Sequence, residues 1–173
     1  MAELNVLTYP DPFLTTIAKP VEDFGESMKE FCQDMVDTMY KNKGLGLAAV
    51  QVGEGKRIFV MDTNYNDEIP IESRTPLILV NPVIVQSEGE QSIEEGCLSV
   101  VDFRAEIKRA AKIVVRYQNP DQGVQELEAE GLQAVCIQHE IDHLDGKIFV
   151  DRLPPLKRKI IQKKLRKQAI EAQ

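Results

Sequence analysis

The sequence has little histidine, tryptophan or cysteine, and each shortage narrows the class of protein. Tryptophan is absent, aromatic residues make up 6% of the 173 residues, and the three cysteines follow no framework spacing. An odd number of cysteines argues against a disulfide scaffold and indicates a reducing compartment. No apolar run approaches the roughly 20 residues of a membrane span, and the first residues show no secretory signal. We therefore expect a cytoplasmic protein with a single domain over residues 1–173.

Hydrophobic residues recur at spacings of three and four in three parts of the chain, which predicts helices there. The first helix is expected from Met28 to about Asn42, with Ser27 opening a capping box and Gly44 as its stop. The second is expected over residues 132–144. The third follows a pair of prolines and is expected over residues 155–172.

Short strands are predicted between these helices. They are expected at residues 57–62, 77–81, 83–86, 93–97, 113–117 and 125–130. Pro82 separates the second strand from the third, and the turn sequence at 119–123 joins the last two as a hairpin. Because helices interrupt runs of antiparallel strands instead of alternating with them, the predicted fold class is α+β. We expect antiparallel sheets packed around a central helix, with a further helix at the C-terminus.

A basic segment ends an otherwise acidic chain. From Leu156 to Gln173 there are seven lysine and arginine residues and one glutamate, a balance of +6. The whole chain carries −7, so residues 1–155 carry −13. The apolar residues expected to face inward from this helix are Leu156, Ile160, Ile161, Leu165 and Ala169. A solvated helix face would account for the charge, and so would contact with an anionic partner such as RNA.

The two histidines of the chain lie four residues apart, in the stretch His139-Glu140-Ile141-Asp142-His143. On a helix this spacing places both imidazoles on one face, one turn apart. Two such rings can share a metal ion, and Glu140 can reach a water molecule beside it. The pattern therefore predicts a metal-dependent hydrolase. Asp142 either supports the metal ligands from behind or is an acid on the helix surface, and we favour the surface position.

A catalytic metal generally has three protein ligands and one open position, so a third ligand is needed. With no third histidine in the chain, the candidates are cysteine and carboxylate side chains. Cys136 lies one turn before His139 on the same face, yet about 4.5 Å further along the helix axis. Cys97 follows Gly96, which would allow close approach of the backbone. The chemistry favours Cys97 and leaves Cys136 as its competitor.

Three segments of the chain, taken together, resemble the signature motifs of peptide deformylases. They are Gly44-Leu45-Gly46-Leu47-Ala48-Ala49-Val50-Gln51, Glu95-Gly96-Cys97-Leu98-Ser99 and His139-Glu140-Ile141-Asp142-His143. The resemblance extends from Tyr9-Pro10-Asp11 to the last helix. One departure is Val101, where proline is common in the family.

The resemblance implies a role for each motif residue in the hydrolysis of a formamide. Cys97, His139 and His143 would bind the metal, and Glu140 would act first as general base and then as general acid. Gln51, through its side-chain amide, and Leu98, through its backbone N–H, would bind the developing oxyanion. Around the substrate, the resemblance implies Leu45, Gly46, Glu95, Gly96, Arg104, Leu132, Val135 and Cys136. Of these, Arg104 either frames the pocket or is simply exposed.

The family also implies a cofactor and partners. The implied native metal is Fe²⁺, with zinc, nickel or cobalt as possible occupants of the site. The implied substrate is the N-formylmethionine end of a newly made polypeptide, and the basic C-terminal helix would contact the ribosome near its exit tunnel; no membrane or DNA partner is expected. Two other functions remain open from the residues: a zinc endopeptidase built on the histidine motif, and a non-catalytic ribosome-binding relative.

Overall fold

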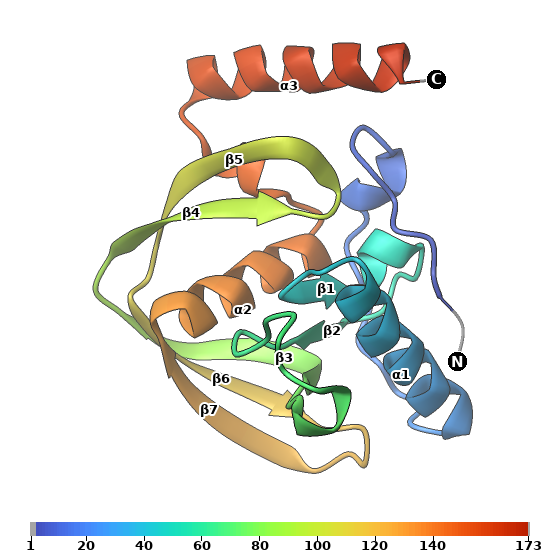
Figure 1. The fold of residues 1–173 in the computed structure, drawn as a ribbon. Coiled ribbons are helices and arrows are strands. Elements are labelled where there is room, and N and C mark those ends of the chain that lie inside the picture. The colour runs from blue at the N-terminus through green and yellow to red at the C-terminus, as the bar shows by residue number, and fades with distance from the viewer. Residues whose placement is uncertain (1–2, 173) are drawn as a thin grey trace.

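A central helix, α2 (Gly131–Leu144), lies between two antiparallel sheets in the computed structural model, which describes residues 3–172 (Figure 1). The larger sheet has the strand order β1-β2-β3-β6-β7, and the smaller one pairs β4 with β5. The strands are β1 (Gly46–Ala48), β2 (Ile58–Met61), β3 (Leu77–Glu88), β4 (Gln91–Cys97), β5 (Val100–Arg109), β6 (Lys112–Gln118) and β7 (Val124–Glu130). The predicted α+β class is confirmed. Met1, Ala2 and Gln173, included in our predicted domain, lie outside the described residues.

Helix α1 (Glu26–Lys41) packs its apolar side against the larger sheet. The buried apolar residues along it are Met28, Cys32, Met35, Val36 and Met39. The predicted helix and its end near Asn42 are therefore confirmed, although the predicted capping box and stop residue are wrong. Gly25 is the N-cap, so Ser27 lies inside the first turn and caps nothing. At the other end Lys43, and not Gly44, takes the left-handed conformation, with φ of 57°.

Helix α2 covers the other side of the larger sheet and forms the main core with it. Ala134, Ile137 and Leu144 are completely buried against sheet residues. The helix ends at Leu144 as predicted, with Asp145 as its C-cap; Gly146 follows, with φ of 79° and an N–H that donates to the carbonyl of His143. A side chain at Gly146 would also lie 2.5 Å from a backbone oxygen of the N-terminal segment. The helix that carries both histidines is thus fixed at its C-terminal end.

Strand β3 is continuous through Pro82, where we predicted a break between two strands. The pairing of β3 with β6 shifts register between Val80 and Val83, so the proline lies in an irregular part of the ladder. Asn81, with φ of 51°, uses its side chain there to bond the backbone of Val21 and the side chain of Gln118. An irregularity of this kind accommodates a residue that lacks a backbone N–H.

Strand β5 lies in a stretch where we predicted no strand. Its buried residues alternate with exposed ones, as they should in a strand with one covered face. Ala105, Ile107 and Arg109 are buried, whereas Glu106 and Lys108 between them are exposed. Because the buried Arg109 is charged, the hydrophobic residues alone do not alternate through the strand, and the sequence pattern did not indicate it.

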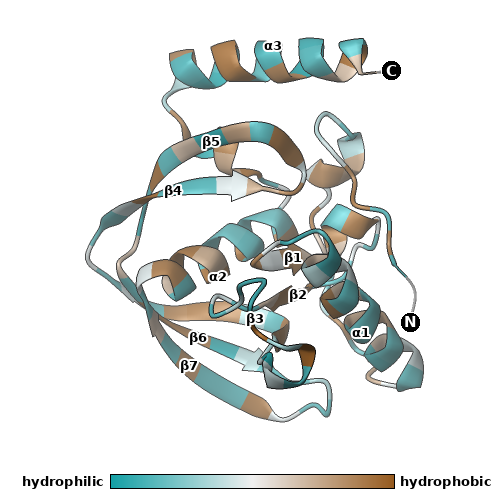
Figure 2. Ribbon diagram, viewed as in Figure 1, coloured by the Kyte–Doolittle hydropathy of each residue, from teal (hydrophilic) through white to brown (hydrophobic). Residues whose placement is uncertain are grey.

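Helix α3 (Pro155–Glu171) lies on the outside of the β4–β5 hairpin (Figure 1). Leu165 is buried there, in a cluster with Phe149 and Leu153. The prediction that Leu156 and Ile160 face inward is wrong, because they are 75% and 59% exposed. Polar and apolar residues are mixed around this helix (Figure 2), so hydropathy did not define one inner face. Across residues 3–172, every helix is too short or too polar to span a membrane.

Candidate active site

Three potential metal-binding atoms converge where α2 faces β4. His139 and His143 approach each other through Nε2, 3.2 Å apart, and Cys97 Sγ lies 3.4 Å from Nε2 of His143. The three ligand atoms all lie within 4.8 Å of one another. One sulfur and two imidazole nitrogens at this spacing suit a single transition-metal ion with an open coordination position. Cys136, the alternative third ligand, is outside this group; its Sγ lies 3.8 Å from the carbonyl oxygen of Leu45.

Glu95 sets the orientation of the first histidine. Its Oε1 lies 2.9 Å from Nδ1 of His139, and both side chains are buried. Because the carboxylate accepts a hydrogen bond from the N–H at Nδ1, Nε2 is left unprotonated, and its lone pair points toward Cys97 and His143. Burial by itself would raise the pKa of Glu95, but bonds from His139 and Arg109 lower it below its ordinary value. Our prediction had placed Glu95 beside the substrate and had not given it a role toward His139.

Glu140 is buried beside the three ligands. Its exposed fraction is 3%, and its Oε1 has no hydrogen-bond partner among the described residues. Burial raises the pKa of Glu140 to about 7, although the neighbouring His139 acts in the opposite direction. A carboxyl group in this range can both accept and release a proton near neutral pH, as general acid–base chemistry requires.

Gln51 lies beside Cys97, within the short helical turn Ala49–Val52. Its Oε1 accepts from the backbone N–H of Ala48 at 2.9 Å, which fixes which end of the amide is the donor. The Nε2 group then donates to Ser99 at 3.0 Å and points at Cys97 Sγ, 3.5 Å away. A buried, oriented N–H donor is therefore placed beside the candidate metal ligands.

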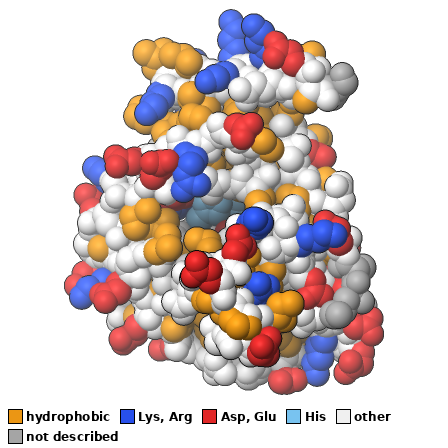
Figure 3. All heavy atoms as spheres, in the orientation of Figure 1, with side chains coloured by type: hydrophobic (Ala, Val, Ile, Leu, Met, Phe, Trp, Pro, Cys, Tyr) orange, Lys and Arg blue, Asp and Glu red, His pale blue; other side chains and the backbone are white. Residues whose placement is uncertain are grey.

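These groups open into a cavity of about 290 Å³. Figure 3 shows histidine surface at the bottom of a hollow in this face of the molecule. Every residue that we predicted for catalysis or substrate binding lines it, namely Leu45, Gly46, Gln51, Glu95, Gly96, Leu98, Arg104, Leu132, Val135, Cys136 and Glu140. Cys97 and His139 also line it, while His143 lies beneath them with no exposed surface. The three sequence motifs are thus brought together by the fold.

Two rim residues are more exposed than a closed pocket would require. Leu132 is 43% exposed. Arg104 has an exposed side chain that pairs with Glu94 at 3.0 Å while also lining the cavity. Both alternatives that we held for Arg104 therefore apply to it: it frames the cavity and it is exposed. Gly96 leaves room for its guanidinium, since a Cβ there would lie 2.6 Å from Nη1 of Arg104.

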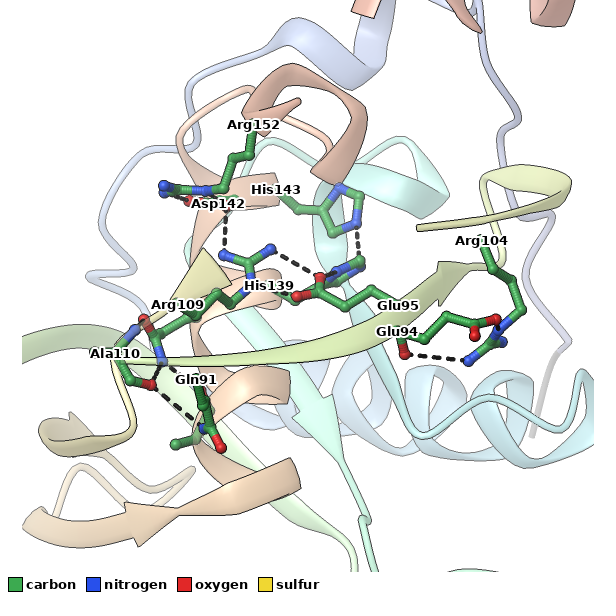
Figure 4. A network of polar contacts seen from close by, with 12 residues as sticks. Gln91, Glu94, Glu95, Arg104, Arg109, Ala110, His139, Asp142, His143 and Arg152 are labelled. Carbon is green, nitrogen blue, oxygen red and sulfur yellow. Dashed lines mark hydrogen bonds and ion pairs between the residues drawn. The ribbon is translucent and has the colours of Figure 1, made fainter. Parts of the chain in front are cut away.

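Sequence reasoning missed a buried group of charges behind His139. Asp142 was predicted to lie on the surface, and this is wrong: it is 5% exposed and pairs with Arg109 and Arg152 (Figure 4). Arg109 also pairs with Glu95. Asp142 lies three residues after His139 on α2, so it faces the same neighbours. Helical spacing could have suggested its burial, but nothing in the sequence identified its partners.

The chain is similar to known proteins over most of its length. The family model described as "Polypeptide deformylase" matches residues 3–159. The chain belongs to the polypeptide deformylase family. A peptide deformylase of Alkalilimnicola ehrlichii is 47% identical over 96% of this chain and 91% of its own length. It follows that this member is a deformylating enzyme with a metal cofactor, and neither a zinc endopeptidase nor a non-catalytic relative is favoured.

Solved structures of deformylases have the same fold. That of Legionella pneumophila has a TM-score of 0.88 and 43% identity, and the match covers 99% of each chain. A peptide deformylase from Acinetobacter baumannii with Met-Ala-Ser bound has a TM-score of 0.81 and 32% identity, covering 88% of this chain and 99% of that one. The peptide bound to that protein begins with methionine.

Proposed function

We propose that this deformylase hydrolyses the formamide of N-formylmethionine at the start of newly made polypeptides, with Cys97, His139 and His143 holding one Fe²⁺ ion. The donor set supports a single bound metal, since the three ligand atoms meet within 4.8 Å and Glu95 leaves Nε2 of His139 free. Bound there, the metal supplies a Lewis acid that lowers the pKa of a water molecule and polarises the formyl oxygen. A thiolate ligand suits a soft divalent ion, and zinc, nickel or cobalt would fit the same donors.

Glu140 is proposed to move the protons of the reaction. Its carboxyl group is buried among the motif residues, and one oxygen is free of protein partners within residues 3–172. As general base it takes the proton from the attacking water, and as general acid it gives that proton to the departing amine. The pKa of about 7 supports both halves of this exchange.

Gln51 and Leu98 are proposed to stabilise the oxyanion that forms on the formyl carbonyl. Gln51 Nε2 is already turned toward Cys97, with its orientation fixed by the backbone of Ala48. The backbone of Leu98 lies next to Cys97 in the chain, on the wall of the same cavity. Hydrogen-bond donors that are oriented before the reaction begins do not have to reorient as negative charge develops on the oxygen. This preorganisation is the basis of their catalytic effect.

The cavity walls are proposed to receive the methionine side chain. Leu45, Leu132, Val135 and Cys136 offer an apolar surface beside the metal ligands, which suits an unbranched thioether. The peptide that follows is proposed to extend along Gly46 and the segment 95–96, pairing with the backbone as an added strand. The relative with Met-Ala-Ser bound supports a substrate of this kind.

The observation that carries the proposal is the meeting of Cys97, His139, His143 and Glu140 at the base of one cavity. The direct test is to incubate the anaerobically purified, iron-loaded protein with formyl-Met-Ala-Ser and to measure formate. We expect formate release and no cleavage of internal peptide bonds. An iron-loaded protein that releases no formate would contradict the proposal.

Changing Gly46 to alanine is expected to lower kcat/KM about 100-fold, the size of effect that a misplacement near 1 Å produces. A Cβ at position 46 would lie 2.5 Å from Oε2 of Glu140 and 3.0 Å from Sγ of Cys136, so Glu140 must move. The matched control is Gly55→Ala, where the nearest side-chain atom is 3.7 Å away. Formate assays of both variants check this; equal rates for Gly46→Ala and the wild type would rule out tight packing around Glu140.

The basic helix α3 is proposed to bring this cytoplasmic enzyme to the ribosome. Among its exposed lysines, Lys163 and Lys167 lie one turn apart, away from the buried Leu165. The double change Lys163→Glu/Lys167→Glu is expected to weaken ribosome binding about tenfold or more, since phosphate contacts dominate such binding. Co-sedimentation with bacterial ribosomes at moderate salt measures it.

The control for this experiment is Lys108→Glu/Lys112→Glu, which changes charge equally on the exposed side of β5 and β6. Both pairs keep Leu165 in place, whereas deletion of the helix would uncover the cluster that Leu165 fills. If the two double variants bind ribosomes equally, the proposed role of α3 fails and the positive charge is a solvated helix face.

A further inference from the structure

A row of charges, buried except for Arg152 at its outer end, extends from the metal site toward helix α3 (Figure 4). Glu95 receives a forked pair of bonds from Arg109, from Nε at 2.6 Å and from Nη2 at 2.9 Å. The third nitrogen of Arg109, Nη1, donates to Asp142 at 3.0 Å. Arg152 bonds the same Asp142, with Nη2 2.7 Å from Oδ1. Two carboxylates and two guanidinium groups thus alternate along the row.

The burial of this row makes each pairing important. The side chains of Arg109, Glu95 and Asp142 are 2%, 4% and 7% exposed. Charges at such depth are tolerated when they are paired, and removal of one partner leaves a buried charge uncompensated. Among residues 3–172, loss of Arg109 would leave Glu95 with only His139 as a side-chain partner, and Asp142 with only Arg152. The arginine is therefore the member on which both carboxylates depend.

Arg109 fixes the direction of Glu95 as well as its charge. Oε1 of Glu95 accepts from both Arg109 and His139, each at 2.9 Å, while Oε2 is held by Arg109. A guanidinium fork sets the plane of the carboxylate that it grips, which a single ammonium group does not do. The orientation of the Glu95 carboxylate in turn directs the Oε1 lone pair that accepts the hydrogen bond from Nδ1 of His139.

The ring of His139 is restrained on its face as well. Phe149 stacks against it with centroids 6.0 Å apart, and Phe103 stacks on Phe149 with centroids 5.9 Å apart. His143 differs, because its Nδ1 has no hydrogen-bond partner within residues 3–172. The charged row therefore acts on one of the two histidines, the one whose second nitrogen it reaches through Glu95.

From this geometry we propose that Arg109 is a positioning residue for the metal ligand His139 and acts through Glu95, with Asp142 and Arg152 holding the arginine in place. It does not touch substrate or the reacting atoms. Its contribution is to keep the Nε2 lone pair of His139 directed at the ion. The inference rests on the proposed metal site and extends it to a residue outside the three motifs.

The test compares Arg109→Met, Arg109→Lys and Glu95→Gln with the double variant Arg109→Met/Glu95→Gln, all in the full chain. The matched control is Arg116→Met, which removes an arginine from an exposed ion pair with Glu126. For each protein, Co²⁺ affinity is measured by competition with a chelator, and the visible spectrum of bound Co²⁺ reports the ligand geometry. Thermal unfolding of the metal-free protein reports stability separately.

We expect Arg109→Met and Glu95→Gln each to weaken Co²⁺ binding 10- to 100-fold, the usual cost of losing a partner of a metal-bound histidine. The double variant should lose no more than the worse single variant, because both act on the same bond to His139. Arg109→Lys keeps the charge but loses the fork, so it should recover part of the affinity. Arg116→Met should bind Co²⁺ as the wild type does.

Several outcomes would overturn the inference. A folded Arg109→Met protein with wild-type Co²⁺ affinity and spectrum would show a structural role alone, and additive losses in the double variant would show that Arg109 does not act through Glu95. If Arg109→Met does not fold, the test rests on Arg109→Lys. Wild-type Co²⁺ affinity in Arg109→Lys would then refute the proposed role of Arg109. A wild-type chain that binds no Co²⁺ would instead refute the proposed metal site itself.

Discussion

Replacing Glu140 with glutamine is expected to slow formate release by about 10³-fold or more while one metal ion per chain stays bound. A positioned acid–base group contributes roughly 10²–10⁴-fold to a reaction rate, and here one carboxyl group is assigned both proton transfers. Glutamine has nearly the same shape, so the neighbours of Glu140, Gly46 and Cys136 among them, keep their places. The kcat of metal-loaded protein on formyl-Met-Ala-Ser is the measurement.

The control is Glu94→Gln, which neutralises a carboxylate on the rim of the same cavity. Its side chain is 62% exposed, and its ion pair with Arg104 belongs to a class that contributes little. We expect a small change in rate from it. Comparable kcat values for Glu140→Gln and the wild type, with metal content matched, would contradict the role of Glu140 as the acid–base group. The attacking water would then be activated without Glu140.

Replacing Cys97 with serine is expected to weaken metal binding at least about 100-fold, whereas Cys136→Ser should leave it intact. Loss of a residue that only hydrogen-bonds to a metal ligand already lowers metal affinity 10- to 100-fold, and this change removes a ligand itself. Sγ of Cys97 lies 3.4 Å from Nε2 of His143, inside the ligand group. Cys136 instead contacts the segment 45–46, and burial holds the pKa of its thiol well above the ordinary value. A thiol that resists ionisation is a poor ligand.

Metal content after purification under one set of conditions distinguishes the two cysteines. The two variants make the same chemical change, so each serves as the other's control for loss of a sulfur atom. Retention of the metal by Cys97→Ser with its loss from Cys136→Ser would reverse the assignment. Formate release should follow metal content in both proteins.

The chemistry of the site was predictable because it depends on short stretches of sequence. His139 and His143 are neighbours on any helix that contains them, and helical geometry alone brings their rings together. Gln51 is the polar residue in a run of small apolar ones, and the fold places it 1% exposed beside Cys97. The resemblance to deformylases then assigned Cys97 in place of Cys136, which spacing by itself had left open.

The errors fall where burial depends on residues far away in the chain. Asp142 was expected on the surface because it is charged, yet Arg109, 33 residues before it, pairs with it inside the protein. The same arginine broke the apolar alternation of β5 and hid that strand. Leu156 and Ile160 were expected to face inward because they are apolar, but α3 contacts the rest of the protein mainly around Leu165.

The sequence by itself determined the α+β class from local hydrophobic spacing and the family from its motifs. Through the resemblance to that family it also identified most of the residues that line the cavity. The tertiary structure decided the rest. It showed that Pro82 lies within one strand, that Glu95 bonds a histidine through its side chain, and that Arg109 links Glu95 to Asp142. The physical reason is that a charge can be buried wherever the fold supplies its partner, and no local pattern records which distant residue that partner is.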